Sequence, residues 1–397
     1  MRVGIFSDVF YPYLAGGGEN RYYQLAKHLV ASGDEVLVVT SNLSGCSSYE
    51  TLFDGRLRIH RVGFPPHPTS RRSILGVPGY FLSSVLKARL VNECDVLDLN
   101  TYASALAGKI VSRLERKPSI VTVHDLFTGQ WSSGHNLVVS ILGSMSEKLI
   151  GLVNSEGPFI TVSESTKRKM IYYLGLDEKS ILVIPNGVDF DGIRKVALGT
   201  GRDSNRIVYV GRLIGYKKVE QVLELVLGLR RLGLDVRADI VGDGPERVPL
   251  ESFASKIGVT ESVRFWGFLK RYEDVARIMS SGTVFVNPSI FEGFGLTLLE
   301  AMAAGTPVVA YDLEGYREYA RNRVNCLLAA RYDFEGFLEN VKSLILDPGM
   351  ARGVSEAGIE TAREFSWKKM TEKVRSTYEA TLQALQDEEG ASIVPQS

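Results

Sequence analysis

Two glutamates eight positions apart, Glu292 and Glu300, form the strongest chemical signal in the sequence. The apolar run 284–287 predicts a strand that leads into this stretch, and a helix is expected to begin near Leu296. Glu292 then lies in a loop, while Glu300 lies in the second helical turn and leans back toward that loop. Carboxylates accept strong hydrogen bonds from hydroxyl groups, so the pair suits a hydroxyl-rich ligand. The alternative is a charged turn followed by a surface glutamate.

Between the glutamates stand Gly293, Phe294 and Gly295, followed by Leu296. Glycine lets backbone N–H groups approach a ligand closely, and here they lie at the expected N-terminus of a helix. We therefore expect these four residues to bind a phosphate or a sugar hydroxyl.

Two cations, Arg212 and Lys217, follow a strand that is expected over residues 207–210. Arg212 offers a planar fork that suits a diphosphate, and Lys217 offers a mobile point charge. Cations near a helix N-terminus oppose the helix dipole unless an anion binds there. We expect both to hold an anion. The alternative, a solvated basic loop, is the interpretation that we favour for Lys218.

A third loop follows the strand expected over residues 3–7 and carries successive glycines, including Gly16 and Gly17. Their N–H groups at a helix start favour phosphate. The run does not match the dinucleotide-binding fingerprint, because Arg21 stands where the third glycine is needed. A flexible turn without a ligand is the alternative.

His124 follows a strand expected over residues 120–123 and is placed to bond a sugar hydroxyl or to position an acceptor. A lone histidine is more often structural, so its functional role depends on the resemblance described below. Asp125 is expected to cap a helix rather than to activate an acceptor.

The elements that must position these residues alternate along the chain, with short β-branched runs between amphipathic segments. This rhythm predicts an α/β protein with parallel sheets. Strands are expected over 3–7, 35–40, 57–62, 96–99, 120–123, 159–162, 181–184, 207–210, 237–241, 263–266, 284–287 and 308–310. Helices are expected over 19–31, after Ser163, and over 219–232, 248–257, 272–280, 296–304, 334–346 and 367–385.

The length of 397 residues favours two domains. We expect a Rossmann-like acceptor-side domain over 1–187 and a second Rossmann-like domain over 188–365, with the seam near Pro185. The helix 366–385 carries a long apolar stripe and is expected to pack back onto the first domain. Residues 386–397 are polar and are expected to be disordered.

The composition excludes several classes of protein. Lys plus Arg and Asp plus Glu both number 46, so long-range attraction to nucleic acid is not expected. Three widely spaced cysteines form neither a disulfide framework nor a zinc knuckle and fit a cytoplasmic protein. No apolar run reaches the roughly 18–20 residues that a membrane span requires.

These motifs together resemble the retaining glycosyltransferases of family 4, which have the GT-B fold: two Rossmann-like domains facing each other across a cleft. The resemblance spans nearly the whole chain and rests on the glycine loop, His124, the segments 185–189, 211–217, 241–245, 265–267 and 304–308, and the Glu-x7-Glu element with its internal Gly-Phe-Gly. One departure is Lys218, where the family often has glycine.

The resemblance implies a role for each matching residue. Arg212 and Lys217 would bind the diphosphate of a nucleotide-sugar donor, Glu292 would lie beside the donor sugar, and Glu300 would bond the ribose. His124 would act from the first domain. The implied reaction transfers a sugar to a hydroxyl acceptor with retention, and a lipid or polysaccharide precursor is a candidate acceptor.

No cofactor is implied beyond the nucleotide sugar as co-substrate. Asp189 and Asp191 form the Asp-x-Asp element with which other nucleotide-sugar enzymes hold a divalent cation. Here it follows the turn at the seam, so we expect a turn and a helix cap rather than a metal site. The two cations and the glycine amides would replace the metal.

Two alternatives remain at this stage: a nucleotide-sugar epimerase of the same fold and a non-catalytic nucleotide-sugar-binding protein. A dehydrogenase lacks support, because both its glycine pattern and its acidic ribose ligand are missing.

The segment 56–89 concentrates cations among apolar residues. A basic amphipathic helix can lie on an anionic membrane, so peripheral contact at the inner membrane face is one hypothesis. A buried helix with a solvated basic edge is the other. A weaker resemblance to the branch that glycosylates phosphatidylinositol-type lipids favours the first. The cations are Arg56, Arg58, Arg61, Arg71, Arg72, Lys87 and Arg89.

Overall fold

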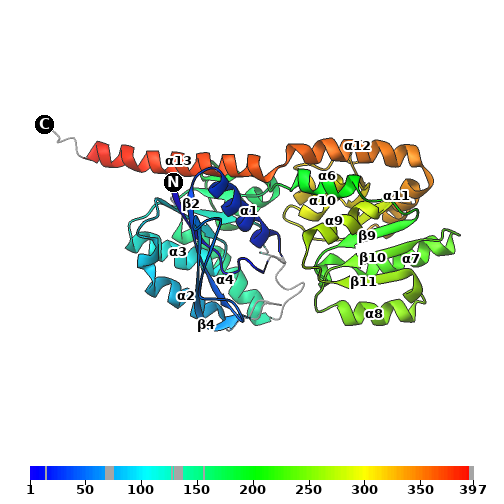
Figure 1. The fold of residues 1–397 in the computed structure, drawn as a ribbon, viewed down its shortest axis with the longest axis horizontal. Coiled ribbons are helices and arrows are strands. Elements are labelled where there is room, and N and C mark those ends of the chain that lie inside the picture. The colour runs from blue at the N-terminus through cyan, green and yellow to red at the C-terminus, as the bar shows by residue number, and fades with distance from the viewer. Residues whose placement is uncertain (14–15, 68–75, 127, 129–136, 155–156, 393–397) are drawn as a thin grey trace. The chain divides into compact units, whose positions relative to one another are not determined.

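The computed structural model describes residues 1–13, 16–67, 76–126, 128, 137–154 and 157–392. The chain divides into two compact units, whose elements are drawn in Figure 1. The first unit comprises Met1–Pro185 together with Trp367–Ser397, and the second comprises Asn186–Ser366. The first unit is therefore built from two stretches of chain, and the second from one.

The first unit contains an eight-stranded sheet in the order β3-β4-β2-β1-β5-β6-β7-β8. All of its neighbouring strands are parallel except β3, which pairs antiparallel with β4 at the edge. The strands are β1 (Arg2–Phe6), β2 (Glu35–Leu43), β3 (Tyr49–Leu52), β4 (Leu57–His67), β5 (Val96–Asn100), β6 (Ser119–Val123), β7 (Phe159–Thr161) and β8 (Ile181–Val183).

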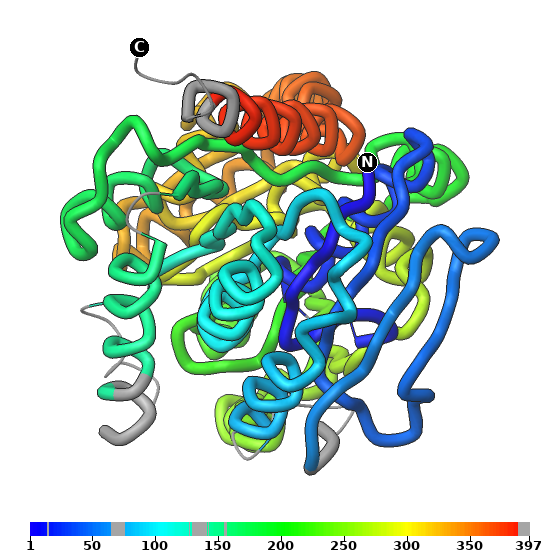
Figure 2. Tube along the Cα trace, turned by 90° about the vertical axis from the view of Figure 1, so that its left-hand side faces the viewer, coloured from blue at the N-terminus to red at the C-terminus, as the bar shows by residue number. Residues whose placement is uncertain are grey.

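Helices cover this sheet, and its central strands are therefore buried except for Arg2 at the start of β1, as expected for a parallel sheet. The strand order runs in opposite directions from β1, and right-handed crossovers therefore place α1 and α3 on opposite faces. Helices α2, α3 and α4 lie side by side, as Figure 2 shows. The helices are α1 (Gly17–Ala31), α2 (Gly76–Leu86), α3 (Ala103–Leu114), α4 (Leu137–Val153), α5 (Glu164–Leu174) and α13 (Trp367–Ser392).

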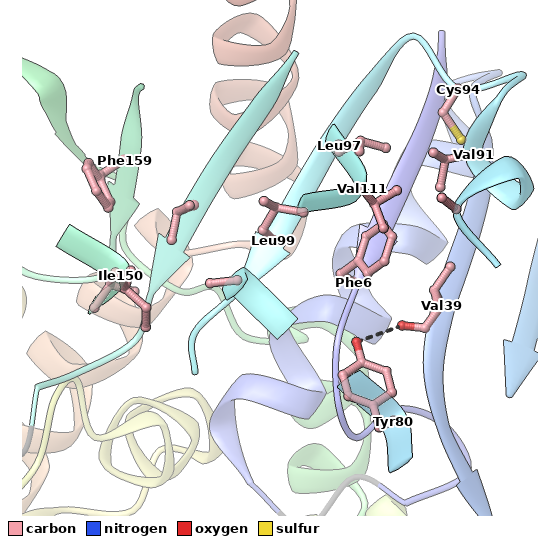
Figure 3. Packing of buried hydrophobic residues seen from close by; sticks show 14 of the residues in the cluster. Phe6, Val39, Tyr80, Val91, Cys94, Leu97, Leu99, Val111, Ile150 and Phe159 are labelled. Atoms are coloured by element: carbon pink, nitrogen blue, oxygen red, sulfur yellow. Dashed lines mark hydrogen bonds between the residues drawn. The ribbon is translucent and has the colours of Figure 1, made fainter. Parts of the chain in front are cut away.

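The apolar core of this unit is drawn in Figure 3. Phe6, Leu97 and Leu99 project from neighbouring strands and pack against Val111 of α3. Tyr80 of α2 is completely buried and turns its hydroxyl toward the carbonyl oxygen of Val39 at 3.4 Å. The core therefore fixes α2 and α3 against the strands.

A buried polar cluster lies in the same unit, and we call it the Asp98 hub. The carboxylate of Asp98 accepts hydrogen bonds from the hydroxyls of Tyr22 at 2.7 Å, Thr122 at 2.9 Å and Tyr378 at 2.5 Å. All four residues are at most 2% exposed. Burial raises the pKa of Asp98, and the three hydroxyls together with the positive charge of Arg21 oppose that rise. The hub joins α1, β5, β6 and α13.

Helix α13 belongs to the first unit through both polar and apolar contacts. Its apolar stripe begins with Trp367 and buries Tyr378 completely, and Arg375 forms an ion pair with Asp34 at 3.0 Å. The helix continues to Ser392, so the expected disorder of residues 386–392 is wrong. Glutamine and glutamate are good helix formers, which accounts for the extension. Residues 393–397 lie outside the described chain.

The second unit contains a six-stranded parallel sheet in the order β11-β10-β9-β12-β13-β14. Its strands are β9 (Arg206–Val210), β10 (Arg237–Val241), β11 (Val263–Gly267), β12 (Val284–Asn287), β13 (Val308–Tyr311) and β14 (Leu327–Ala329). Its helices are α6 (Phe190–Leu198), α7 (Glu220–Arg231), α8 (Arg247–Lys256), α9 (Tyr272–Ser281), α10 (Leu296–Ala304), α11 (Phe334–Leu346) and α12 (Pro348–Glu364).

The segment 56–89 differs from the continuous basic surface that the membrane hypothesis requires. Arg61 is 2% exposed and forms an ion pair with Glu50 at 2.7 Å, and Arg58 pairs with Glu93 at 3.3 Å. Their charges are therefore already neutralised within the fold. Arg71 and Arg72 lie outside the described residues. Among the described helices, none is both long and apolar enough to cross a membrane.

Candidate active site

The loops that carry the predicted donor-binding residues leave neighbouring strands of the second sheet. Strands β9 and β12 are adjacent and parallel, so the loops after them start at the same edge. The two loops also touch, since the N–H of Ile290 donates to the carbonyl oxygen of Tyr216 at 3.0 Å. The topology therefore brings two distant motifs together.

Lys217 and Glu292 meet at this edge as a direct ion pair between Nζ and Oε1. Their side chains are 14% and 13% exposed, so the pair is largely shielded from water. The side-chain amide of Asn287 approaches the same carboxylate oxygen at 3.4 Å. One of the two predicted cations and one of the two predicted carboxylates are thus in contact, although 75 positions separate them.

Arg212 is exposed and lies on the same loop as Lys217. Its guanidinium donates to the hydroxyl of Tyr216 at 3.0 Å, and Tyr209 donates to its carbonyl oxygen at 3.2 Å. Arg212 therefore remains accessible to an anion from solvent, whereas Lys217 is occupied by Glu292.

Lys218 adopts a left-handed backbone conformation, with φ of 51°. This region is costly for a residue that carries a Cβ atom and is free for glycine. A glycine at position 218 would avoid this cost, which Lys218 bears. The Lys218 ammonium pairs with Glu220 at 3.3 Å, which agrees with the solvated role expected for it.

The Gly-Phe-Gly segment ends in a conformation that only glycine adopts readily. Gly295 has φ of 77° and directly precedes α10, and a Cβ atom there would lie 2.3 Å from the ring of Tyr316. The hydroxyl of Tyr319 donates to the carbonyl oxygens of Phe294 at 2.9 Å and Gly295 at 2.7 Å. We call the loop from Glu292 to Gly295 the donor loop. Two buried tyrosines, Tyr316 and Tyr319, contact it and restrain its backbone.

Glu300 lies in the second turn of α10, as expected, and is only 7% exposed. Burial raises its pKa to about 7, and a hydrogen bond with the hydroxyl of Tyr272 opposes this rise. Near neutral pH the two protonation states are therefore close in free energy. A ligand that donates hydroxyl hydrogen bonds to this carboxyl group would stabilise its ionised form.

Gly16, Gly17 and His124 belong to the first unit. Gly16 caps α1 and Gly17 begins it, so the glycine run lies at a helix N-terminus as predicted. His124 directly follows β6 and packs edge-on against Tyr22, with ring centroids 5.7 Å apart. A Cβ atom on Gly18 would lie 3.3 Å from Cδ2 of His124, so the glycine run and the histidine are neighbours.

Family models match nearly the whole chain. One described as Glycosyltransferase Family 4 matches residues 15–191, and one described as Glycosyl transferases group 1 matches residues 193–361. The chain belongs to glycosyltransferase family 4. It is a glycosyltransferase that uses nucleotide-sugar donors.

Curated relatives of this glycosyltransferase align along most of its length. It is 28% identical to a phosphatidyl-myo-inositol mannosyltransferase of Mycobacterium leprae, with 96% of each chain covered. It is 27% identical to a 2-deoxystreptamine glucosyltransferase of Streptomyces kanamyceticus, with 77% of this chain and 84% of the relative covered. These relatives act on different acceptors, so family membership leaves the acceptor undefined.

Solved structures with this fold include a sucrose-phosphate synthase from Thermosynechococcus elongatus. It has a TM-score of 0.80 and 20% identity and covers 96% of this chain and 99% of its own. Anabaena HepE in complex with UDP-glucose has a TM-score of 0.74 and 18% identity, with 96% and 100% covered. The glycosyltransferase therefore has the expected GT-B fold, with two Rossmann-like domains built on parallel sheets.

Two aspartates of the glycosyltransferase test the expectations about caps and metal. Asp189 caps α6 and accepts a hydrogen bond from the N–H of Gly192 at 3.1 Å, so the predicted cap is confirmed. Asp125 does not cap a described helix. It forms an ion pair with Lys169 at 2.9 Å and accepts from the N–H of Leu126. Within the described part of the chain, no group of three His, Cys, Asp or Glu side chains could hold a metal ion.

Sequence reasoning missed Tyr316 and Tyr319, the two tyrosines under the donor loop. Both are almost completely buried, and burial raises the pKa of each, with the charge of Glu292 contributing. They remain neutral hydroxyl donors at physiological pH. Glycine at position 295 has no Cβ atom and so permits the close approach of the Tyr316 ring, but the sequence alone does not show which residue makes this approach.

Proposed function

We propose that this protein is a metal-independent retaining hexosyltransferase that moves a sugar from a nucleoside diphosphate sugar to a hydroxyl acceptor. The observation that carries the proposal is the Lys217–Glu292 ion pair at the carboxyl edge of the second sheet. The shielded cation and carboxylate follow the ends of two parallel strands. α/β proteins bind their ligands at this edge of the sheet. The acceptor class that we favour is a lipid or polysaccharide precursor.

The pair suggests how the donor is engaged. When a diphosphate arrives, Lys217 exchanges the carboxylate of Glu292 for phosphate oxygens, and the exposed fork of Arg212 binds the same group. Glu292 is then released to accept hydrogen bonds from hydroxyls of the donor sugar. Glu300 accepts from the ribose, while the N–H groups of Gly293 and the residues up to Leu296 donate to the phosphates.

Charge accumulates on the departing diphosphate as the bond to the sugar breaks. The transition state is therefore stabilised more strongly than the ground state by Lys217, Arg212 and the amides of the donor loop. This difference lowers the barrier. In our proposal Gly16, Gly17 and His124 contribute from the first domain, with His124 bonding a sugar hydroxyl or positioning the acceptor. Attack on the same face of the sugar leads to retention.

Release of nucleoside diphosphate from a panel of donors, with and without candidate acceptors, tests the transfer. The anomeric configuration of the product, followed by NMR, tests retention, and activity after treatment with EDTA tests metal independence. An epimerase would convert the donor without an acceptor, and a binding protein would release nothing. Either result would refute the proposal.

We further propose that a short surface near α2 contacts anionic membranes. Phe64 is 81% exposed, Leu82 58% and Leu86 76%, and the exposed cations Lys87 and Arg89 follow directly. Exposed apolar side chains beside cations suit an anionic leaflet. Co-sedimentation with vesicles should require anionic lipid and should weaken in L82S/L86S, while an unchanged bound fraction in the variant would refute the contact.

A further inference from the structure

An open hollow of about 390 Å³ lies in the second unit, at the carboxyl end of β13 and beside β14. We call it the arginine hollow. It is lined by Asp312, Arg317, Ala320, Arg321, Asn322 and Leu328. None of these residues belongs to the donor-binding set described above. The hollow lies beside β14, the outermost strand on this side of the second sheet.

Arg321 is held in place by the backbone. One guanidinium nitrogen donates to the carbonyl oxygen of Arg317 at 2.6 Å and to that of Ala320 at 2.9 Å. The backbone N–H of Arg321 donates to the side-chain oxygen of Asn325 at 2.7 Å. A guanidinium fixed in this way loses little conformational entropy when it binds a ligand with its remaining donors.

The other polar groups of the hollow are mostly donors as well. The side-chain oxygen of Asn322 accepts from the N–H of Leu328 at 2.9 Å, so its amide nitrogen is the end left for a ligand. Arg317 is 3.5 Å from the carboxylate of Asp312, and both side chains are substantially exposed. Exposed ion pairs of this kind are weak, so a phosphate can compete for Arg317.

The charge pattern selects a class of ligand. Two guanidinium groups and an amide favour the several acceptor oxygens of a phosphate group. Asp312 repels a bare phosphate but accepts hydrogen bonds from hydroxyls. The combination fits a small molecule that carries both groups, namely a phosphorylated sugar or polyol.

The segment that forms one wall of the hollow also supports the donor loop. Arg317, Ala320 and Arg321 line the hollow, whereas Tyr319 donates to the carbonyl oxygens of the donor loop. Contact is close, since a Cβ atom on Gly315 would lie 2.2 Å from the carbonyl oxygen of Glu292. A ligand that braces residues 314–321 therefore also restrains the donor loop.

We propose that the arginine hollow is an effector site for a phosphorylated sugar or polyol, and that its occupation stabilises the donor loop. The functional consequence rests on the proposed role of that loop in binding the donor, whereas binding at the hollow does not depend on it. The two parts are therefore tested by separate measurements.

Calorimetric titration with glycerol 3-phosphate tests binding. We expect saturable binding to the wild type, at least tenfold weaker binding to R317Q, and unchanged affinity in R323Q. Among the described residues, the Arg317 guanidinium has no hydrogen bond to a backbone atom, so its loss is not expected to unfold the turn. Arg323 is an exposed arginine six positions further along the chain that does not line the hollow, which makes it the matched control.

Two further arms separate the hollow from the donor site. K217Q should still show saturable binding of glycerol 3-phosphate, because Lys217 does not line the hollow. Inorganic phosphate should bind more weakly than glycerol 3-phosphate to the wild type, and this difference should shrink in D312N. Equal affinities in the wild type and R317Q, or loss of binding in K217Q, would overturn the effector site.

Hydrogen exchange tests the coupling without any donor. Saturating glycerol 3-phosphate should slow exchange of the amides from Glu292 to Leu298 several-fold in the wild type and leave them unchanged in R317Q. Unaltered exchange in the wild type, despite proven binding, would overturn the coupling. Neither result depends on turnover, so failure here is distinguishable from failure of the proposed transferase activity.

Discussion

Each domain of this glycosyltransferase holds a largely shielded carboxylate, and the two carboxylates have opposite kinds of partner. Asp98 of the first domain accepts three hydroxyl hydrogen bonds, which together join four elements. Glu292 of the second domain is paired with Lys217, whose charge a ligand can take over. A carboxylate that is buried and already accepts hydrogen bonds from three neutral hydroxyls is not accessible to a substrate. A carboxylate that is paired with a mobile cation can lose this partner when an anionic ligand binds the cation.

The comparison therefore assigns a structural role to the Asp98 hub and supports the functional role that we propose for the Lys217–Glu292 pair. Burial alone would not have separated them, since both groups are largely withdrawn from water. The two carboxylates are distinguished by the groups that contact them, which are neutral hydroxyls for Asp98 and a lysine for Glu292. The following experiments test this distinction, from the largest expected effect to the smallest.

Replacing Asp98 with alanine should have the largest effect and should act on folding. Three buried hydroxyls and the nearby charge of Arg21 would lose their acceptor, which costs about 3–5 kcal/mol of unfolding free energy. Urea unfolding measures this. D98N is the matched control, because it keeps the shape and can still pair with the hydroxyls, and it should recover most of the stability. If D98A were as stable as the wild type, the structural role assigned to the Asp98 hub would be wrong.

Replacing Lys217 with glutamine should act on catalysis instead. Loss of one charge that stabilises the departing diphosphate should lower kcat by about 10²–10³-fold. The unfolding free energy should change by no more than about 1 kcal/mol, since glutamine can still donate to Glu292. Donor-dependent release of nucleoside diphosphate gives the rate. K218Q, at the neighbouring partly exposed lysine, is the control and should retain wild-type turnover. An equal loss in both variants would contradict the assignment.

Replacing Glu300 with glutamine should stabilise the free protein in a pH-dependent manner. Burial raises the pKa of this group to about 7, above its ordinary value of 4.5. The folded state therefore holds a proton more tightly than the unfolded state, and wild-type stability falls as the pH rises from about 4.5 to 7. At pH 8 the penalty is at most about 3 kcal/mol.

Thermal unfolding at pH 5 and pH 8 checks this prediction. E300Q should melt above the wild type at pH 8 and close to it at pH 5, and it should bind nucleoside diphosphate more weakly. A difference in melting temperature that is the same at both pH values would show that the carboxyl group does not carry the effect.

Replacing Tyr378 with phenylalanine should have the smallest effect in this series. The change removes one hydroxyl from the Asp98 hub and preserves the ring, at a cost of about 1–3 kcal/mol. Urea unfolding should show the loss, and KM for the donor should stay unchanged. A raised KM with unchanged stability would place the hub in the functional category instead.

Much of the architecture follows from the sequence, because β-branched runs and amphipathic segments alternate clearly. Most expected strands agree with the structure to within a few residues. The edge strands β3 and β14 and the helices α3, α4 and α12 were not among the elements expected. Edge strands are short and only partly apolar, so their pattern is weak. Helix α12 has its start signal in Asp347 and Pro348, which the hydrophobic pattern alone does not reveal.

The candidate site shows a similar division. Spacing and residue type identified Lys217 and Glu292, but not that they pair, because the pairing depends on the adjacency of β9 and β12. Counting charges likewise misjudged Arg61, which is buried against Glu50. Tertiary contacts between distant positions decide both outcomes, and a single sequence does not encode them in a local pattern.

Helix α13 has a consequence for how the molecule is made. The first domain needs Tyr378, yet residues 186–366 must be synthesised before that tyrosine leaves the ribosome. At ordinary translation rates the delay is roughly 10–40 s. During this interval the nascent first domain holds Asp98 with one donor missing, while the second domain, being continuous, has all of its own residues available. We expect the later-made domain to reach its native state first, and the earlier one to wait for the last helix.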